Sequence, residues 1–188
     1  MKLDADTLFS YAYDATKGTL ELGAATERRL SQLKGCFADE GAYARALEEG
    51  DPLVYTVSSI EPGSDPGDLH LGLGVLYPGK VGDEYFLTKG HFHERREAAE
   101  FYIGLAGSGL MLLEDGETGL SRLEVLSAGR MVYVPGYAAH RTINTGTEPL
   151  RYFGVYPADA GHDYGAIAER NFLKKVVEEA GEPVLRDR

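Results

Sequence analysis

Several features are scarce or absent in this 188-residue sequence, and each absence narrows what the protein can be. There is no tryptophan and only one cysteine, Cys36, so no disulfide can form within the chain. A lone cysteine fits a reducing, cytoplasmic setting, and we expect Cys36 to be structural. No run approaches the ~20 apolar residues that a membrane-spanning helix needs, and the first residues lack the apolar core of a signal peptide. We therefore expect a cytoplasmic protein with no membrane partner.

Basic residues are also in the minority. The chain has 30 acidic and 19 basic residues, which gives a formal net charge of −11. This balance argues against nucleic acid or an anionic membrane as a partner, because either would require a basic face. It does not exclude a small anionic substrate, which needs only a few local hydrogen-bond donors.

From residue 54 onward the sequence consists of short strand-like runs separated by Gly, Pro and Asp. Strands at such close spacing favour an all-β sandwich or barrel over alternating strands and helices. The expected strands are 54–60, 69–77, 85–93, 100–105, 109–113, 120–126, 131–134, 140–144, 150–156, 172–177 and 183–185. The expected short helices are 27–34, 38–49 and 164–171.

The length predicts a single domain. We expect residues 1–188 to form it, with 1–50 as an N-terminal extension packed on a barrel made by 54–157. Residues 158–188 would add a helix and strands.

The segment Thr88-Lys-Gly-His-Phe-His carries the clearest chemical signal. If it is a strand, His91 and His93 share one face, because strand side chains alternate. Glu100 begins the next strand-like run and His140 begins a later one. Imidazole nitrogens and one carboxylate suit Fe²⁺, Mn²⁺, Ni²⁺ or Zn²⁺. Spacing alone does not establish that all four side chains converge.

The pattern resembles the two motifs of the cupin family. The first motif is matched by His91, His93, Glu100 and Gly107, and the second by Gly129, Pro135, His140 and Asn144. The spacer from His93 to Glu100 is longer than in most cupins. Tyr137 stands where a glycine usually follows the proline.

A closer resemblance, over most of 27–170, is to the cupin-type glucose-6-phosphate isomerases of archaea and some bacteria. Three blocks carry it: Leu-Tyr-Pro-Gly-Lys-Val-Gly at 76–82, the histidine segment at 88–93, and Tyr-Pro-Ala-Asp-Ala-Gly-His-Asp-Tyr-Gly at 156–165. The last block is long and unusual, which makes it specific. Gly74 and Ala138 depart from the family pattern, which often has a hydroxyl and an aromatic residue there.

The resemblance implies a cupin double-stranded β-helix, that is, a jelly-roll barrel with a few short peripheral helices, and a homodimer. It implies one divalent metal ion per chain, with Fe²⁺ expected first and Mn²⁺, Ni²⁺ or Zn²⁺ as alternatives. The implied metal ligands are His91, His93, Glu100 and His140. The implied lining of a sugar-phosphate pocket is Thr88, Gly90, Tyr102, Tyr137, Tyr156, His162 and Tyr164.

The implied reaction interconverts glucose 6-phosphate and fructose 6-phosphate, in glycolysis and gluconeogenesis. Glu100 and His140 are the expected catalytic residues, with Glu100 as the candidate proton shuttle between C1 and C2. A hydride shift is the competing mechanism. We expect no phosphate contact from Lys89.

Two other readings remain open at this point. An iron dioxygenase of the same fold would need open coordination positions but no phosphate donors. A non-catalytic sugar-binding cupin would usually lack part of the ligand set, which here is complete.

Overall fold

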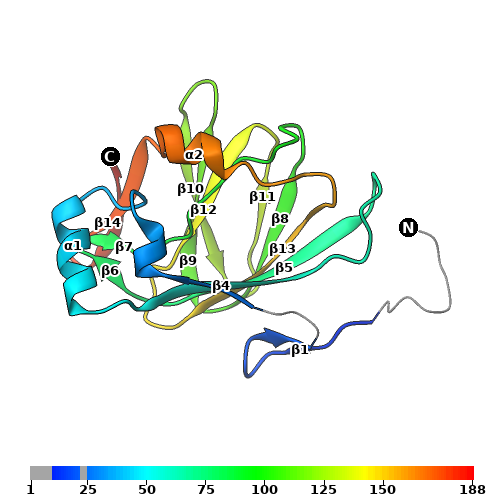
Figure 1. The fold of residues 1–188 in the computed structure, drawn as a ribbon, viewed down its shortest axis with the longest axis horizontal. Coiled ribbons are helices and arrows are strands. Elements are labelled where there is room, and N and C mark those ends of the chain that lie inside the picture. Colours follow the sequence, from blue (N-terminus) through cyan, green and yellow to red (C-terminus); the bar gives the residue numbers. More distant parts are fainter. Residues whose placement is uncertain (1–9, 22–24) are drawn as a thin grey trace.

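The computed structural model describes residues 10–21 and 25–188, and antiparallel strands dominate its architecture (Figure 1). The largest sheet has the strand order β11-β8-β13-β5-β4-β3. Its strands are β3 (Thr26–Arg29), β4 (Leu53–Ile60), β5 (Leu69–Leu76), β8 (Glu100–Ala106), β11 (Met131–Val134) and β13 (Leu150–Pro157).

A second sheet lies across the core from the first. It has the order β10-β9-β12, with β9 (Ser108–Asp115), β10 (Ser121–Ser127) and β12 (Ala138–Ile143). Two isolated bridges, Leu87↔Ile143 and His91↔His140, lay the segment 87–91 along the free edge of β12. Among the described strands, the two sheets are not hydrogen-bonded into a closed barrel.

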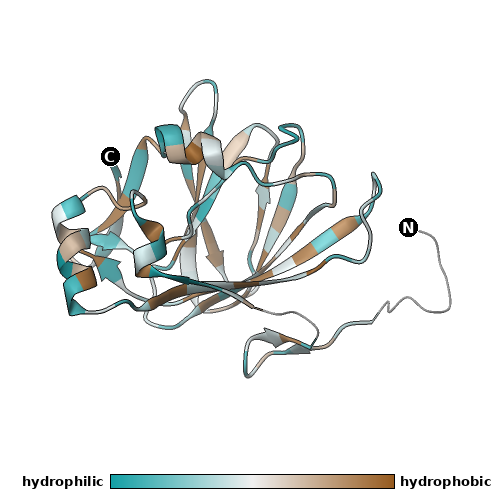
Figure 2. Ribbon diagram, in the orientation of Figure 1, coloured by the Kyte–Doolittle hydropathy of each residue, from teal (hydrophilic) through white to brown (hydrophobic). Residues whose placement is uncertain are grey.

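The inward faces of both sheets supply one apolar core. Met111 and Leu112 on β9, Leu76 on β5 and Leu150 on β13 are each completely buried. Figure 2 shows how apolar and polar stretches alternate along the strands. On β8 this alternation also points Glu100 and Tyr102 inward, while Phe101 remains exposed.

A third sheet and two helices flank this core. The sheet order is β15-β14-β7-β6, with β6 (Lys80–Val81), β7 (Glu84–Tyr85), β14 (Lys174–Glu179) and β15 (Glu182–Asp187). Helix α1 (Glu40–Glu49) begins after Asp39, whose carboxylate accepts a hydrogen bond from Ala42 N at 2.8 Å. Helix α2 (Tyr164–Arg170) is capped in the same way by Asp163, which accepts from Ala166 N at 3.0 Å.

The described part of the N-terminal region packs on the large sheet. A small hairpin of β1 (Tyr13–Asp14) and β2 (Thr19–Leu20) places the Tyr13 ring edge-on to Phe153, with 5.1 Å between centroids. The first nine residues, which we expect to carry no signal peptide, and residues 22–24 lie outside the described part. None of the described helices is both long and apolar enough to cross a bilayer.

The all-β expectation is confirmed, but two expected elements are wrong. The helix expected at 27–34 is strand β3 followed by a 3₁₀ turn, η1 (Leu30–Leu33), because the free edge of β4 takes up this backbone as a sixth strand. The strand expected at 85–93 ends at Tyr85. Gly90 interrupts it with a φ of +73°, a conformation that regular strands do not contain.

Candidate metal centre and the pocket around it

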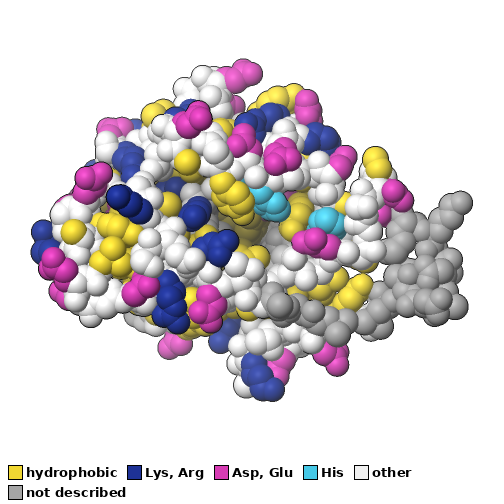
Figure 3. Space-filling model, viewed as in Figure 1, with side chains coloured by type: hydrophobic (Ala, Val, Ile, Leu, Met, Phe, Trp, Pro, Cys, Tyr) yellow, Lys and Arg dark blue, Asp and Glu magenta, His cyan; other side chains and the backbone are white. Residues whose placement is uncertain are grey.

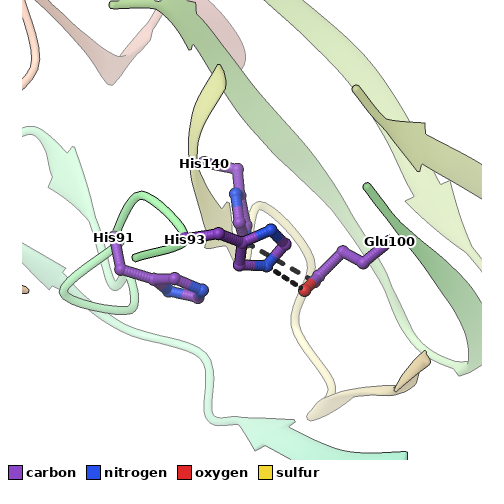
Figure 4. Close-up of side chains that lie close together, drawn as sticks. All are labelled: His91, His93, Glu100 and His140. Atoms are coloured by element: carbon purple, nitrogen blue, oxygen red, sulfur yellow. Dashed lines mark hydrogen bonds and ion pairs between the residues drawn. The ribbon is translucent and has the colours of Figure 1, made fainter. Parts of the chain in front are cut away.

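The four predicted ligands lie together (Figure 4), and three of them, His91, Glu100 and His140, line a pocket. Their ligand atoms all lie within 4.8 Å of one another. His93, Glu100 and His140 are between 1% and 4% exposed, and His91 is 9% exposed. Water is therefore largely excluded from the cluster.

Three different parts of the chain bring these side chains together. His140 comes from β12, and Glu100 is the first residue of β8 in the opposite sheet. His91 is fixed beside His140 by two backbone hydrogen bonds, His91 N to His140 O at 3.2 Å and His140 N to His91 O at 3.1 Å. These two hydrogen bonds, rather than the alternation of a regular H-x-H strand, align the imidazoles of His91 and His140.

The contact between His93 and Glu100 requires a cation. His93 Nδ1 lies 2.9 Å from the carbonyl oxygen of Ala98, which can only accept, so Nδ1 carries a proton. The neutral ring then presents the lone pair of Nε2 to Glu100 Oε2 at 2.9 Å. Two acceptors at this distance need a proton or a metal ion between them.

Three more buried atoms in the cluster have no hydrogen-bond partner: His91 Nε2, His140 Nε2 and Glu100 Oε1. Glu100 Oε1 lies 3.4 Å from His140 Nε2. Buried polar atoms without partners are rare and destabilising, and here they face one another. Nitrogen and carboxylate donors in this arrangement fit a divalent transition-metal ion.

The ionisation of these groups reflects their burial and mutual proximity. Burial and the neighbouring His140 hold the pKa of His91 well below its usual value. Burial alone would raise the pKa of Glu100, but His140 and His93 outweigh it and hold that pKa well below its usual range. Burial likewise disfavours the charged form of His93, yet its hydrogen bond to Glu100 gives a net raised pKa.

The pocket has an empty volume of about 630 Å³, including its open mouth. On this side the molecule is hollowed near its middle, where a histidine and Lys or Arg side chains gather (Figure 3). Six predicted lining residues do line the pocket: Thr88, Gly90, Tyr102, Tyr156, His162 and Tyr164. The structure does not bring Tyr137 there, since its side chain is 49% exposed and its hydroxyl donates to Glu97 Oε1 at 3.2 Å.

Aromatic rings close one wall of the pocket. His162 stacks on Tyr164, with centroids 5.9 Å apart and planes 9° apart. His91 contacts both rings, with its centroid 4.5 Å from that of His162 and 5.5 Å from that of Tyr164. Burial lowers the pKa of His162, which favours a neutral imidazole that can donate or accept a hydrogen bond.

A chain of hydroxyl groups orients Thr88. Its Oγ1 accepts from Thr142 N at 3.1 Å and from Thr142 Oγ1 at 3.2 Å. Tyr152 completes the chain, with its hydroxyl 2.9 Å from Thr142 Oγ1. Because each hydroxyl has one proton, Thr88 keeps its own proton free to donate into the pocket.

The pocket is also lined by three residues that were not predicted, Tyr55, Lys89 and Tyr152. Lys89 was not expected to contact the phosphate, yet it lines the pocket beside Gly90, where the strand is interrupted. Tyr152 lies opposite Gly74 in the β5–β13 register, and a Cβ at residue 74 would come within 2.5 Å of the Tyr152 hydroxyl oxygen. The sequence alone does not show that Tyr152 lies beside Gly74, because this depends on the register of the two strands.

This combination of facing antiparallel sheets and an inward His₃Glu cluster defines the cupin fold class. A solved structure of oxalate oxidase shares the fold, with a TM-score of 0.50 and 16% identity over 60% of this chain and 56% of that one. Residues 27–187 match the model of the family described as glucose-6-phosphate isomerase (GPI). The chain belongs to that family.

Curated relatives agree over nearly the whole length. The chain is 51% identical to a glucose-6-phosphate isomerase of Thermococcus litoralis, covering 95% of this chain and 94% of the relative. It is 52% identical to a glucose-6-phosphate isomerase of Pyrococcus horikoshii, covering 93% and 92%.

Proposed function

We propose that this protein is a metal-dependent isomerase that interconverts glucose 6-phosphate and fructose 6-phosphate. The observation that carries the proposal is the pocket itself. Its inner end holds buried nitrogen and carboxylate atoms without partners, and its wall presents hydroxyl and imidazole groups suited to a polyol phosphate. Family membership supports the same reaction.

His91, His93, Glu100 and His140 are the proposed ligands of one divalent ion, with Fe²⁺ favoured and Mn²⁺, Ni²⁺ or Zn²⁺ as alternatives. A bound ion would act as a Lewis acid toward the sugar oxygens at C1 and C2. The lone pair that His93 Nε2 turns toward Glu100 would then serve as a ligand. The Ala98 carbonyl would hold that ring in the required tautomer.

Glu100 is the proposed proton shuttle. Its low pKa keeps the carboxylate ionised, and Oε1 has no hydrogen-bond partner, so it is available as a base. In the aldose-to-ketose direction, Glu100 takes the proton from C2 and returns it to C1, while the proton on O2 passes to O1. Direct hydride transfer from C2 to C1 is the competing route. It needs no base at carbon, and the proton on O2 still passes to O1.

Tyr102 would assist at the same end of the sugar. Burial and the neighbouring Glu100 raise its pKa well above the usual value, so its hydroxyl remains protonated and can donate. His140 is proposed as a ligand that also lies beside Glu100 and supports its ionised state.

The phosphate would bind at the Thr88 and Gly90 end of the pocket. Thr88 has a free proton, and Gly90 lets the backbone approach an anion closely. Tyr156, His162 and Tyr164 line the same pocket and would add side-chain donors for the sugar phosphate.

We also propose that residues 1–188 form one cupin domain, that it works in the cytoplasm, and that it is a homodimer. The support for a dimer is an exposed apolar patch on the edge of the six-stranded sheet, made of Phe101, Met131 and Tyr133. The rings of Phe101 and Tyr133 contact each other at a tilt of 54°, with their centroids 5.1 Å apart.

The test is an assay with fructose 6-phosphate before and after chelation. Metal-loaded protein should produce glucose 6-phosphate. Chelation should abolish this activity, and returning the metal should restore it. An oxygen electrode in the same cuvette serves as the control for a dioxygenase. Sugar-phosphate binding without turnover in the loaded protein would instead support a non-catalytic sugar-binding protein.

A further inference from the structure

Lys89 and Gly90 form a bulge beside strand β12. Leu87 bridges Ile143, and Thr88 N donates to Thr142 O at 3.0 Å. The next paired residues are His91 and His140. Two residues, Lys89 and Gly90, therefore face the single residue Arg141, and such bulges re-aim the backbone beside functional sites.

Arg141 is buried beneath this bulge and bonds to it. Its side chain is 2% exposed, and Nη2 donates to the carbonyl oxygen of Lys89 at 2.6 Å. The guanidinium also lies 4.1 Å above the ring centroid of Phe172, and Nη2 reaches Asn171 Oδ1 at 3.4 Å. These contacts fix the direction in which the Lys89 carbonyl points.

The same contact determines where the Gly90 amide points. In a planar trans peptide the carbonyl and the N–H point in opposite directions. The Lys89 carbonyl faces Arg141, so the Gly90 N–H faces the pocket that Gly90 lines. None of the residues in the described part of the chain accepts a hydrogen bond from this amide.

The charge of Arg141 is not neutralised by direct contact. No described carboxylate lies within ion-pairing distance of the guanidinium, and its Nε has no hydrogen-bond partner. The Arg141 guanidinium remains charged at neutral pH, because arginine is not deprotonated in proteins. Its positive field acts on the Lys89–Gly90 peptide in the direction that strengthens the Gly90 N–H as an anion donor.

We propose that Arg141 is a positioning residue for the substrate's phosphate. It holds the Lys89–Gly90 peptide so that the Gly90 amide and the Thr88 hydroxyl donate to the same anion, and it supplies the positive potential behind them. The inference rests on the proposed function only in naming the anion as the phosphate of a sugar.

A residue with a side chain could not replace Gly90 and keep the shape of the bulge. A Cβ there would lie 2.7 Å from Phe172 Cε2 and 2.9 Å from the carbonyl oxygen of His140. The ring on which Arg141 stacks thus also requires the glycine that gives the bulge its shape.

The test uses inorganic phosphate as the probe, on metal-loaded protein. We expect Arg141→Met to weaken competitive inhibition by phosphate and to raise KM for fructose 6-phosphate, each at least tenfold. Metal content and the kcat at saturation should change less than threefold. For Arg141→Lys, the phosphate inhibition constant and the KM should lie between those of wild type and Arg141→Met.

Arg170→Met is the matched control. Arg170 also lies over a phenylalanine ring, 5.5 Å from the Phe92 centroid, and bonds to the buried Glu114 at 2.6 Å, but it does not line the pocket. It should lose stability while the phosphate inhibition constant stays within twofold of wild type. A folded Arg141→Met protein with unchanged phosphate inhibition would overturn the inference.

A second measurement on wild-type protein covers the case in which Arg141→Met does not fold. Phosphate should shift the ¹⁵N-labelled Gly90 amide proton downfield in a saturable manner, and an unmoved Gly90 resonance at saturation would also overturn the inference. If phosphate binds through Arg141 and Gly90 but fructose 6-phosphate is not turned over, the proposed function fails and the anion site stands. If fructose 6-phosphate is turned over and Arg141 makes no difference, only the anion site fails.

Discussion

At the scale of single residues, the site is defined by atoms whose ordinary hydrogen-bond partners are missing. His93 turns a lone pair toward a carboxylate, and His91 and His140 present buried nitrogens with nothing to bond. Buried groups in this condition destabilise a fold unless something compensates them. A bound cation would compensate all of them at once.

The first residue-scale prediction concerns Glu100→Gln in metal-loaded protein. The amide keeps the size of the side chain and one oxygen ligand but cannot act as a base. We expect turnover to fall by roughly 10²–10⁴, the usual contribution of general base catalysis, with most of the bound metal and sugar phosphate retained.

Isotope transfer separates the two mechanisms in the wild-type enzyme. Proton shuttling predicts that solvent deuterium enters the product at C1. Near-normal turnover of Glu100→Gln, together with no solvent deuterium in the wild-type product, would favour the hydride route.

The second residue-scale prediction concerns pH. Metal requires neutral imidazoles, and in the metal-free protein the raised pKa of His93 makes it the ligand that holds a proton to the highest pH. As the pH is lowered, protons compete with the metal for the imidazoles. Metal affinity should begin to fall above pH ~6.5, because the pKa of His93 is raised, and should fall further below it. Calorimetry in buffers of different ionisation enthalpy should detect the released proton. An affinity that is constant from pH 8 to pH 5 would remove the histidines from the site.

At the scale of elements, loops and helix ends position the pocket on a rigid frame of strands. The end of β13 carries Tyr156, and the first residue of α2 is Tyr164. Asp163 joins these parts. Its carboxylate caps α2 and forms an ion pair with Arg96, and its backbone forms a β-bridge with Phe92. Arg96 also donates to the carbonyl of His93, so one arginine links the helix cap to the metal-ligand segment.

The element-scale prediction follows from this connection. Asp163→Ala should loosen the start of α2 and lower the melting temperature by about 2–4 °C, as expected for a lost helix cap. KM for fructose 6-phosphate should rise severalfold because Tyr164 and His162 lose their fixed positions. Asp39→Ala removes the equivalent cap of α1, away from the pocket, and should lower the melting temperature with KM unchanged. Equal KM values in both variants would contradict the coupling of α2 to substrate binding.

At the scale of the whole molecule, the edge strand β11 is the feature that most needs a partner. Met131 and Tyr133 are 68% and 54% exposed, and an uncovered apolar edge strand invites association. A two-fold dimer would cover this edge on both protomers with one self-complementary contact.

The whole-molecule prediction is that Tyr133→Arg shifts the protein from dimer to monomer. Two buried arginines facing each other across a two-fold axis would repel and would be desolvated. Sedimentation velocity should show the change, with Leu69→Arg, an equally exposed apolar position elsewhere, remaining dimeric. A wild-type monomer, or a variant dimer of wild-type stability, would exclude this edge as the interface.

The sequence by itself determined the identities of the chemical groups and the all-β character. The spacing of short apolar runs predicted every strand of the two large sheets except β3, since burial on one face imposes that pattern locally. The resemblance to the two cupin motifs supplied the ligand set. The blocks at 88–93 and 156–165 supplied most of the pocket, because each block carries several of its residues close together in the chain.

Only the tertiary structure decided what depends on contacts between distant segments. The sequence predicted a strand at 85–93, yet the bulge at Lys89 and Gly90 exists because β12 and Arg141 hold it from the other side. Tyr137 fits the motif but lies outside the pocket, while Tyr152 enters the pocket because Gly74 on a neighbouring strand leaves room for its ring. Register and bulges arise from pairing across the sheet, and no local pattern in the sequence records them.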